Sequence, residues 1–164
     1  MLFPELAAPV LKRVVNVASV PQRSPFRYPG GKTWLVPNIR AWLSSLSARP
    51  KEFIEPFAGG GIIGLTVAFE QRVDHVILVE KDERVGAVWQ TIIENGDGEQ
   101  LAEKIEQFPF SPEQVKHVLM KEHRVLLEQA FRTIIQNRVN RGGIMAKGAG
   151  MIKSGEHGKG IASR

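Results

Sequence analysis

Apolar residues between Trp34 and Leu46 recur every three or four positions, at 34, 35, 39, 42, 43 and 46. This period is typical of an amphipathic helix with one face on a core. Pro37 fits such a helix if it falls in the first turn, where its missing N–H is no loss. We therefore expect a helix over residues 34–46.

A different pattern begins at residue 52 and predicts strands that alternate with helices. Residues 52–55 (EFIE) are expected to form a short strand, and the apolar run at 75–79 (HVILV) a second strand that is buried on both faces. A loop at 56–61 (PFAGGG) and a helix through 62–69 separate them, and another helix is expected from 83 to 94. This strand–helix–strand–helix order predicts an α/β fold with a parallel, right-handed sheet.

After the turn at 95–98 (NGDG) the pattern is helical only. One helix is expected over 99–108. Another, in one or two pieces, is expected from Ser111 to Val139, with Ser111 as N-cap and Pro112 at the first helical position. Residues 140–164 hold 7 of the 16 glycines and few large apolar side chains, which favours a flexible loop or an incomplete element. Residues 1–23 show little periodicity and are interpreted as a leader or extension, with a possible helix.

The charge of the chain is distributed unevenly. The 164 residues carry a formal net charge of +5, and residues 120–164 alone contain nine Lys and Arg against three Asp and Glu. The whole basic excess therefore lies in the last quarter. Such asymmetry suits a polyanion partner such as nucleic acid, although a solvated basic tail gives the same pattern.

Composition excludes several classes of protein. The chain has no cysteine, which rules out disulfides, thiolate metal sites and a Cys nucleophile. No apolar run approaches the ~18–20 residues of a membrane-spanning helix. Residues 1–20 lack the basic n-region of a signal peptide. We expect a cytoplasmic protein with no membrane association, and no metal site is predicted.

The run Gly59-Gly60-Gly61-Ile62-Ile63-Gly64 lies between an expected strand and helix, and Glu80 ends the next strand. Glycines permit the tight turn and let the backbone approach a ligand, and an acidic side chain about 20 residues further on can accept both hydroxyls of a ribose. The pattern predicts an adenosine-bearing cofactor. Its spacing also fits G-x-G-x-x-G, so a dinucleotide stays possible, as does a glycine turn without a ligand.

A second motif, Tyr28-Pro29-Gly30-Gly31-Lys32-Thr33, resembles the end of a P-loop, but Phe26 stands where the first glycine is required and no strand precedes it. The P-loop interpretation therefore fails. A lysine after a double-glycine turn at a helix N-terminus can still meet a carboxylate. The alternative is a helix-entry turn with a solvated lysine.

Together these motifs resemble the Dam-like, alpha-class adenine-specific DNA methyltransferases. In that family an aromatic-x-Gly-Gly-Lys motif, here Tyr28 to Lys32, precedes a Phe-x-Glu-Pro-Phe-x-Gly-x-Gly motif, here Phe53 to Gly61. The resemblance spans residues 24–164, is strongest over 27–82, and covers the family's N-terminal half only. It implies S-adenosylmethionine as cofactor, adenine N6 as methyl acceptor, double-stranded DNA as partner and a restriction-modification or phage context.

The resemblance also implies roles for single residues. Tyr28 would pack against the cofactor and Lys32 would pair with its methionine carboxylate. The loop from Phe57 to Gly61 would pass under the methionine and ribose, and Glu80, where the family more often has Asp, would bind the ribose, with Asp82 as the fallback acid. The complete predicted cofactor site is Tyr28, Gly31, Lys32, Glu55, Phe57, Gly59, Gly61 and Glu80.

In the family, a long helix ends in an Asn-Arg-x-x-x-x-Gly stretch that leads into a glycine-containing recognition hairpin. This chain has Asn137-Arg138 and Gly142-Gly143 at the matching places, but lacks the aromatic residue that the family often carries between them. Asn137, Arg138, Arg141 and Lys147 are therefore the predicted DNA-binding residues, with Lys153 and Lys159 as further candidate phosphate contacts.

The family's Asp-Pro-Pro-Tyr catalytic motif is absent from these 164 residues, which contain no Pro-Pro pair. We therefore predict no catalytic residue. The expectation is an incomplete Rossmann-like methyltransferase sheet: residues 24–98 bind the cofactor, and 99–164 begin a helical DNA-recognition insertion with a basic, glycine-rich end. A truncated or split enzyme, with a second chain supplying the other half, and a degraded remnant are both open, and residues 24–164 alone are expected to be unstable or to self-associate.

Two other classes of function remain open. One is an NAD-dependent oxidoreductase fragment that uses Gly59, Gly61, Gly64 and Glu80. The other is a DNA-binding remnant without catalytic activity.

Overall fold

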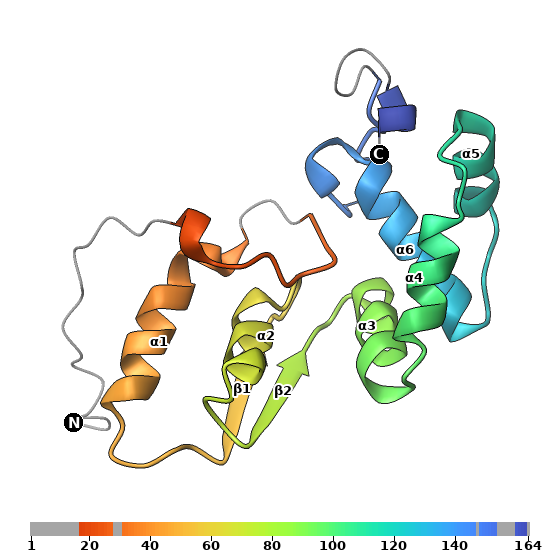
Figure 1. Cartoon of the computed structure of the whole chain (residues 1–164). Helices are drawn as coiled ribbons and strands as arrows, with labels where there is room; N and C mark the ends of the chain where they lie inside the picture. The colour runs from red at the N-terminus through yellow and green to blue at the C-terminus, as the bar shows by residue number, and fades with distance from the viewer. Residues whose placement is uncertain (1–16, 28–30, 147, 154–159, 164) are drawn as a thin grey trace. The chain divides into compact units, whose positions relative to one another are not determined.

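The computed structural model describes residues 17–27, 31–146, 148–153 and 160–163 (Figure 1). Its contacts divide the chain into two compact units. The first unit contains residues up to Ser24 and Gly30–Val79, and the second contains Pro25–Pro29 and Glu80–Arg164. The second unit is therefore discontinuous in the sequence.

The first unit is an α/β layer built on a parallel strand pair. Strand β1 (Glu52–Pro56) pairs with β2 (His75–Val79), with Glu52 opposite His75 and Pro56 opposite Val79. Helix α2 (Ile62–Phe69) connects them, and α1 (Val36–Ser45) follows the 3-10 turn η3 (Lys32–Leu35). The expected helices and both strands are confirmed, including Pro37 in the first turn of α1.

Helix α2 packs closely on one face of the strand pair because Gly64 has no side chain. A Cβ at Gly64 would lie 2.5 Å from Leu78 Cδ2, 2.9 Å from Glu55 Oε2 and 3.1 Å from Val76 Cγ1. The core beneath is made by α1, α2 and two residues outside the named elements, and the strands and η3 contribute half-buried side chains. Its buried members are Val20, Val36, Leu43, Ile62, Ile63, Val67 and Val73.

Strand β2 is less buried than its sequence predicts. The prediction that residues 75–79 are buried on both faces is wrong: His75 and Val79 are exposed and the three residues between them are half-buried. A sheet of two strands, with α2 packed on one face, cannot enclose a strand completely.

Val20 was predicted to lie in an N-terminal extension, but its side chain is 2% exposed and packs in the core, after the 3-10 turn η2 (Val17–Ser19). Residues 1–16 of the predicted leader or extension, with its possible helix, lie outside the described residues.

The second unit is helical and is built around α6 (Leu126–Val139), which packs against α3 (Glu83–Trp89), α4 (Gly98–Glu106) and α5 (Pro112–Met120). Helix α3 continues into the π-helical turn η4 (Gln90–Glu94), as expected for one helix over 83–94. Ser111 caps α5 by accepting from Gln114 N, and Pro112 begins the helix, as predicted. The helical pattern at 111–139 is in two pieces.

The described residues 140–146 and 148–153 fold back onto the end of α6. Asn140 and Met151 make an isolated antiparallel bridge, and Ile152 N donates to Val139 O at 2.8 Å. The described residues after α6 include the 3-10 turns η5 (Arg141–Gly143) and η7 (Gly160–Ser163). Among the described residues no helix is long and apolar enough to cross a membrane.

Replacing Gly64 with Ala tests the close packing of α2. We expect Gly64→Ala to lower the free energy of unfolding by about 1–3 kcal/mol, because the new methyl overlaps a strand side chain and a buried carboxylate. Urea unfolding followed by circular dichroism measures the change.

The matched control is Gly86→Ala in α3, where a Cβ would meet nothing within 4 Å. This variant is expected to be unchanged or more stable by about 0.5–1 kcal/mol, because Ala is the better helix former. Equal effects of the two substitutions would contradict the packing argument.

Candidate functional site

The glycine loop between β1 and α2 is a tight left-handed turn. Gly59 has φ +54° and Gly61 has φ +62°, a backbone region that favours glycine. Ala58 N donates to Val79 O at 2.8 Å and Gly61 N to Ala58 O at 2.8 Å, so the loop starts as an extension of the strand ladder and then folds back into the helix. The predicted strand–glycine loop–helix motif is confirmed.

Phe57 is the unusual residue of this loop. Its φ of +56° lies in the left-handed region, and its side chain is 81% exposed. Such a conformation costs a bulky L-residue of order 1–3 kcal/mol and persists only where neighbouring contacts hold it. An exposed aromatic side chain on a strained backbone favours a functional over a packing role for Phe57.

Lys32 supplies the contact that holds Phe57. Its ammonium donates to the Phe57 carbonyl oxygen at 2.7 Å and lies 2.6 Å from Glu55 Oε1. Lys32 thus ties the start of η3 to the end of β1, 23 residues further along the chain. Two residues that sequence analysis placed separately in a cofactor site contact each other directly.

Glu55 is 3% exposed, and its second oxygen, Oε2, accepts from Gly64 N at 2.7 Å. The carboxylate therefore links Lys32, β1 and the first turn of α2. A buried charge of this kind is tolerated only with a close partner of opposite sign, and removal of one partner costs far more than the pair is worth. The Lys32–Glu55 pair is thus the structural centre of the glycine loop.

Glu80 and Asp82 follow β2 and belong to the second unit. Glu80 Oε1 accepts from Asp82 N at 2.8 Å. Asp82 caps α3: it accepts from Arg84 N at 3.0 Å and from the Arg84 guanidinium at 2.9 and 2.6 Å. The Arg84 guanidinium lowers the pKa of Asp82, against the opposing effect of desolvation. Asp82, the fallback acid for a ribose, thus has a capping role in this structure.

A second charge cluster in the first unit is structural. Arg40 Nε donates to Glu70 Oε1 at 2.9 Å, and Arg72 Nε lies 3.3 Å from Glu70 Oε2. Burial acts to raise the pKa of Glu70, but Arg40 and Arg72 outweigh it and hold the pKa below its usual value. This cluster joins α1 to the end of α2.

The DNA-binding prediction for Asn137 needs correction. Asn137 is 0% exposed, its Nδ2 donates to Arg27 O at 2.9 Å and Gly143 O at 2.8 Å, and its Oδ1 accepts from Arg27 N at 2.9 Å. A fully buried side chain with these partners cannot contact DNA in this structure. It clamps residue 27 and the loop after α6 onto the helix end.

Pattern alone could have indicated this burial. Asn137 lies three residues after Ile134 and seven after Ala130, so it falls on the apolar face of α6.

The other predicted site residues are placed as follows. Gly31 is half-buried and precedes η3, with φ −53° and ψ 143°. Arg138 is half-buried and donates to Pro25 O at 3.2 Å, whereas the side chain of Arg141 is exposed. Tyr28, Lys147 and Lys159 lie outside the described residues, and Lys153 is exposed. Among the described residues no three His, Asp or Glu lie close enough to hold a metal ion.

A parallel strand pair joined by a glycine turn and a closely packed helix is the unit from which nucleotide-type α/β folds are built. Comparison with known proteins gives the particular family. A family model for the D12 class N6 adenine-specific DNA methyltransferases matches residues 28–138. The match covers more than half of the chain, and the chain belongs to this family, which confirms the resemblance seen in the sequence. A search of curated proteins found no match.

The Asp82 cap predicts a pH-dependent stability. Asp82→Ala is expected to lower the free energy of unfolding by about 1 kcal/mol at pH 7, the usual value of such a cap. Because the folded-state pKa lies below the ordinary value of 3.8, the stabilisation is complete above that pH and is lost as pH falls through the folded pKa. Urea midpoints measured from pH 7 down to pH 2 should show the two proteins converging.

Asp97 provides the control for this experiment. It occupies the N-cap position of α4 but makes no side-chain capping hydrogen bond. Asp97→Ala should therefore cost less than Asp82→Ala at pH 7. A constant difference between wild type and Asp82→Ala across the whole pH range would refute the assignment.

The Asn137 clamp predicts a large effect on folding. Asn137→Ala leaves the Arg27 N–H, the Arg27 carbonyl and the Gly143 carbonyl without their partner, and we expect a loss of about 2–4 kcal/mol in the free energy of unfolding. Arg141→Ala, two residues beyond the end of α6, should change it by less than about 0.5 kcal/mol. Thermal unfolding of both variants measures this, and a stable Asn137→Ala protein would contradict the clamp.

Proposed function

We propose that residues 24–98 bind S-adenosylmethionine, with the glycine loop of the first unit as the central contact, and that residues 99–164 bind double-stranded DNA, as part of an adenine N6-methyltransferase. Family membership supports methyl transfer to adenine in general. The observation that carries the cofactor assignment is the loop itself: left-handed Gly59 and Gly61, an exposed Phe57, and a partly exposed ammonium held beside them. S-adenosylmethionine would supply a methyl group bound to a sulfonium.

Lys32 is able to bind the cofactor directly. An ammonium has three N–H donors; the Phe57 carbonyl accepts one of them, and Glu55 Oε1 is an ion-pair partner at 2.6 Å. The side chain is 29% exposed, so a further donor is available to an anion. We assign it to the methionine carboxylate, with Glu80 on the ribose and Tyr28 against the cofactor. Lys32 thus both fixes the loop and binds the ligand.

The glycine spacing alone does not separate this cofactor from NAD, because Gly64 is explained by helix–strand packing in either case. The family match favours S-adenosylmethionine. The transfer step is assigned to residues outside these 164, either elsewhere in a longer protein or in a second chain, because the chain contains no Asp-Pro-Pro-Tyr motif. Residues 24–98 and 99–164 keep their proposed cofactor-binding and DNA-recognition roles within this scheme.

The cofactor assignment is tested by calorimetric titration of the chain with S-adenosylmethionine and, separately, with NAD. We expect binding of the first ligand only, weakened about tenfold or more by Lys32→Ala or by Glu80→Ala, since each removes a charge-assisted contact. The matched controls are Lys51→Ala and Glu52→Ala, which remove exposed charges of the same signs from the first unit outside the loop.

Lys32→Ala also leaves Glu55 buried and unpaired, so a double variant separates binding from folding. Lys32→Met with Glu55→Gln removes both charges and keeps an acceptor for Gly64 N, which should restore much of the stability lost in Lys32→Ala. Cofactor affinity should stay weak. Recovery of affinity together with stability would show that Lys32 acts only through Glu55, and binding of NAD in place of S-adenosylmethionine would overturn the proposal.

A further inference from the structure

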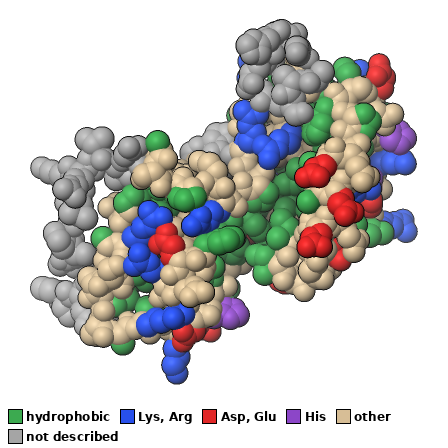
Figure 2. Space-filling view, viewed as in Figure 1, with side chains coloured by type: hydrophobic (Ala, Val, Ile, Leu, Met, Phe, Trp, Pro, Cys, Tyr) green, Lys and Arg blue, Asp and Glu red, His purple; other side chains and the backbone are tan. Residues whose placement is uncertain are grey.

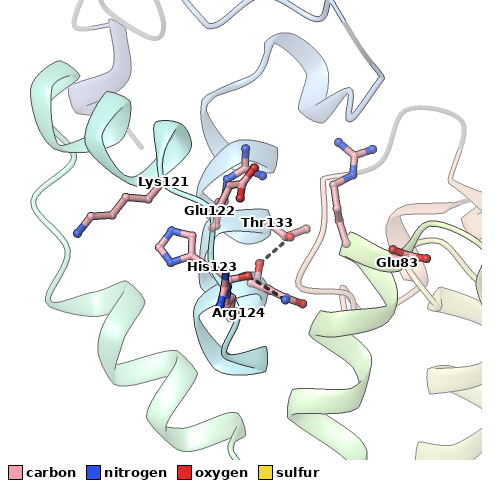
Figure 3. A pocket seen from close by; sticks show the side chains of 9 residues that line it. Glu83, Lys121, Glu122, His123, Arg124 and Thr133 are labelled. Atoms are coloured by element: carbon pink, nitrogen blue, oxygen red, sulfur yellow. Dashed lines mark hydrogen bonds between the residues drawn. The ribbon is translucent and has the colours of Figure 1, made fainter.

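A polar groove lies within the second unit, and none of the residues that line it was assigned above to DNA binding. It has a volume of about 540 Å³ and is formed by the start of α3, the connection between α5 and α6, and one face of α6 (Figure 3). None of its lining residues is apolar. They are Glu83, Arg84, Lys121, Glu122, His123, Arg124, Gln129, Arg132 and Thr133.

The α5–α6 connection at the edge of this groove is held by side-chain contacts to carbonyl oxygens of the connection itself and of the last turn of α5. Arg132 Nη2 donates to Leu119 O at 2.9 Å, and Gln129 Nε2 donates to His123 O at 2.9 Å. The His123 ring nitrogen Nε2 lies 3.3 Å from Val118 O. The backbone that carries Lys121 and Arg124 is thereby fixed at several points, so a ligand need not order it on binding.

The cations of the groove differ in how far they are already neutralised. Arg84 is paired with Asp82, and Arg132 is hydrogen-bonded to a carbonyl, which leaves its charge uncompensated. Lys121 and Arg124 are exposed, and neither has an ion-pair or hydrogen-bond partner among the described residues. These two side chains are the ones that an incoming anion can engage without breaking an existing contact.

The side chains that line the groove indicate which class of ligand it binds. Sites for small organic ligands are lined mainly by apolar and aromatic side chains, whereas this groove has no apolar side chain and one aromatic ring, that of His123. Uncompensated Lys and Arg side chains on an open polar surface are instead the groups that contact phosphates of a nucleic acid strand. Figure 2 shows that Lys and Arg side chains also gather at the upper end of the second unit.

We propose that this groove binds the DNA phosphate backbone, with Lys121 and Arg124 as phosphate contacts and Arg132 as a fixed positive charge behind them. The inference rests on the proposed function and extends it from the loop after α6 to the α5–α6 connection. Glu122, between the two cations in sequence, opposes the phosphate and limits the strength of binding. The contact is independent of DNA sequence.

Fluorescence anisotropy with a labelled 20-base-pair duplex tests the groove, measured for the full chain over a series of salt concentrations. Removing two phosphate contacts should reduce the slope of log K against log salt by about 1.8, since each contributes about 0.9. Lys121→Ala with Arg124→Ala is expected to show this loss. The control, Lys81→Ala with Lys116→Ala, removes two exposed cations of the same unit outside the groove and should leave the slope unchanged.

A variant that is expected to bind DNA more tightly provides a test that misfolding cannot mimic. Glu122→Gln removes an exposed carboxylate from the groove and should tighten duplex binding roughly two- to fivefold at low salt. Glu113→Gln, an exposed carboxylate of α5 outside the groove, should not.

The groove proposal is overturned if the Lys121/Arg124 and the Lys81/Lys116 double variants change the slope equally, if neither changes it, or if the wild-type chain does not bind a duplex. The proposed cofactor function is judged separately, by titration with S-adenosylmethionine. A chain that binds the cofactor but shows no dependence of DNA binding on Lys121 and Arg124 keeps that function and loses the groove.

Discussion

The glycine loop depends on one buried charge, the carboxylate of Glu55. With only 3% exposure it cannot rely on water, so it requires the Lys32 ammonium on one side and the Gly64 amide on the other. These two contacts fix the three parts of the unit that carry the candidate site: the start of η3, the end of β1 and the first turn of α2. The left-handed backbone of Phe57 persists because the same ammonium also binds its carbonyl.

Local features of the sequence predicted the elements well, for physical reasons that individual residues illustrate. The run at 75–79 is apolar and mostly β-branched, and it forms β2 over those same residues. Ser111 followed by Pro112 satisfies the orphan N–H groups of a helix start, and α5 begins there. These signals are local, because the chain's own backbone and neighbouring side chains decide them.

What the sequence could not supply were contacts between distant residues. Lys32 and Glu55 were both predicted to bind the cofactor, and nothing in their spacing along the chain indicated that they form an ion pair with each other. Asn137 had the character of a DNA contact because its partner, Arg27, is 110 residues away. The burial of β2 was overestimated because a strand's composition says nothing about how many strands and helices pack around it. Family membership could be recognised from the motifs, since their order along the chain is itself the signal.

The second unit has an unusual relation to the sequence, because Arg27 is held by Asn137 although the residues on both sides of 25–29 belong to the first unit. A fragment that begins at residue 80 therefore lacks part of its own fold, and the amide of Asn137 would face an empty place where the backbone of Arg27 belongs. Gene dissection at the apparent boundary after β2 would thus produce a damaged helical unit. Expression of that unit by itself calls for residues 25–27 to be rejoined through a linker or supplied as a separate peptide.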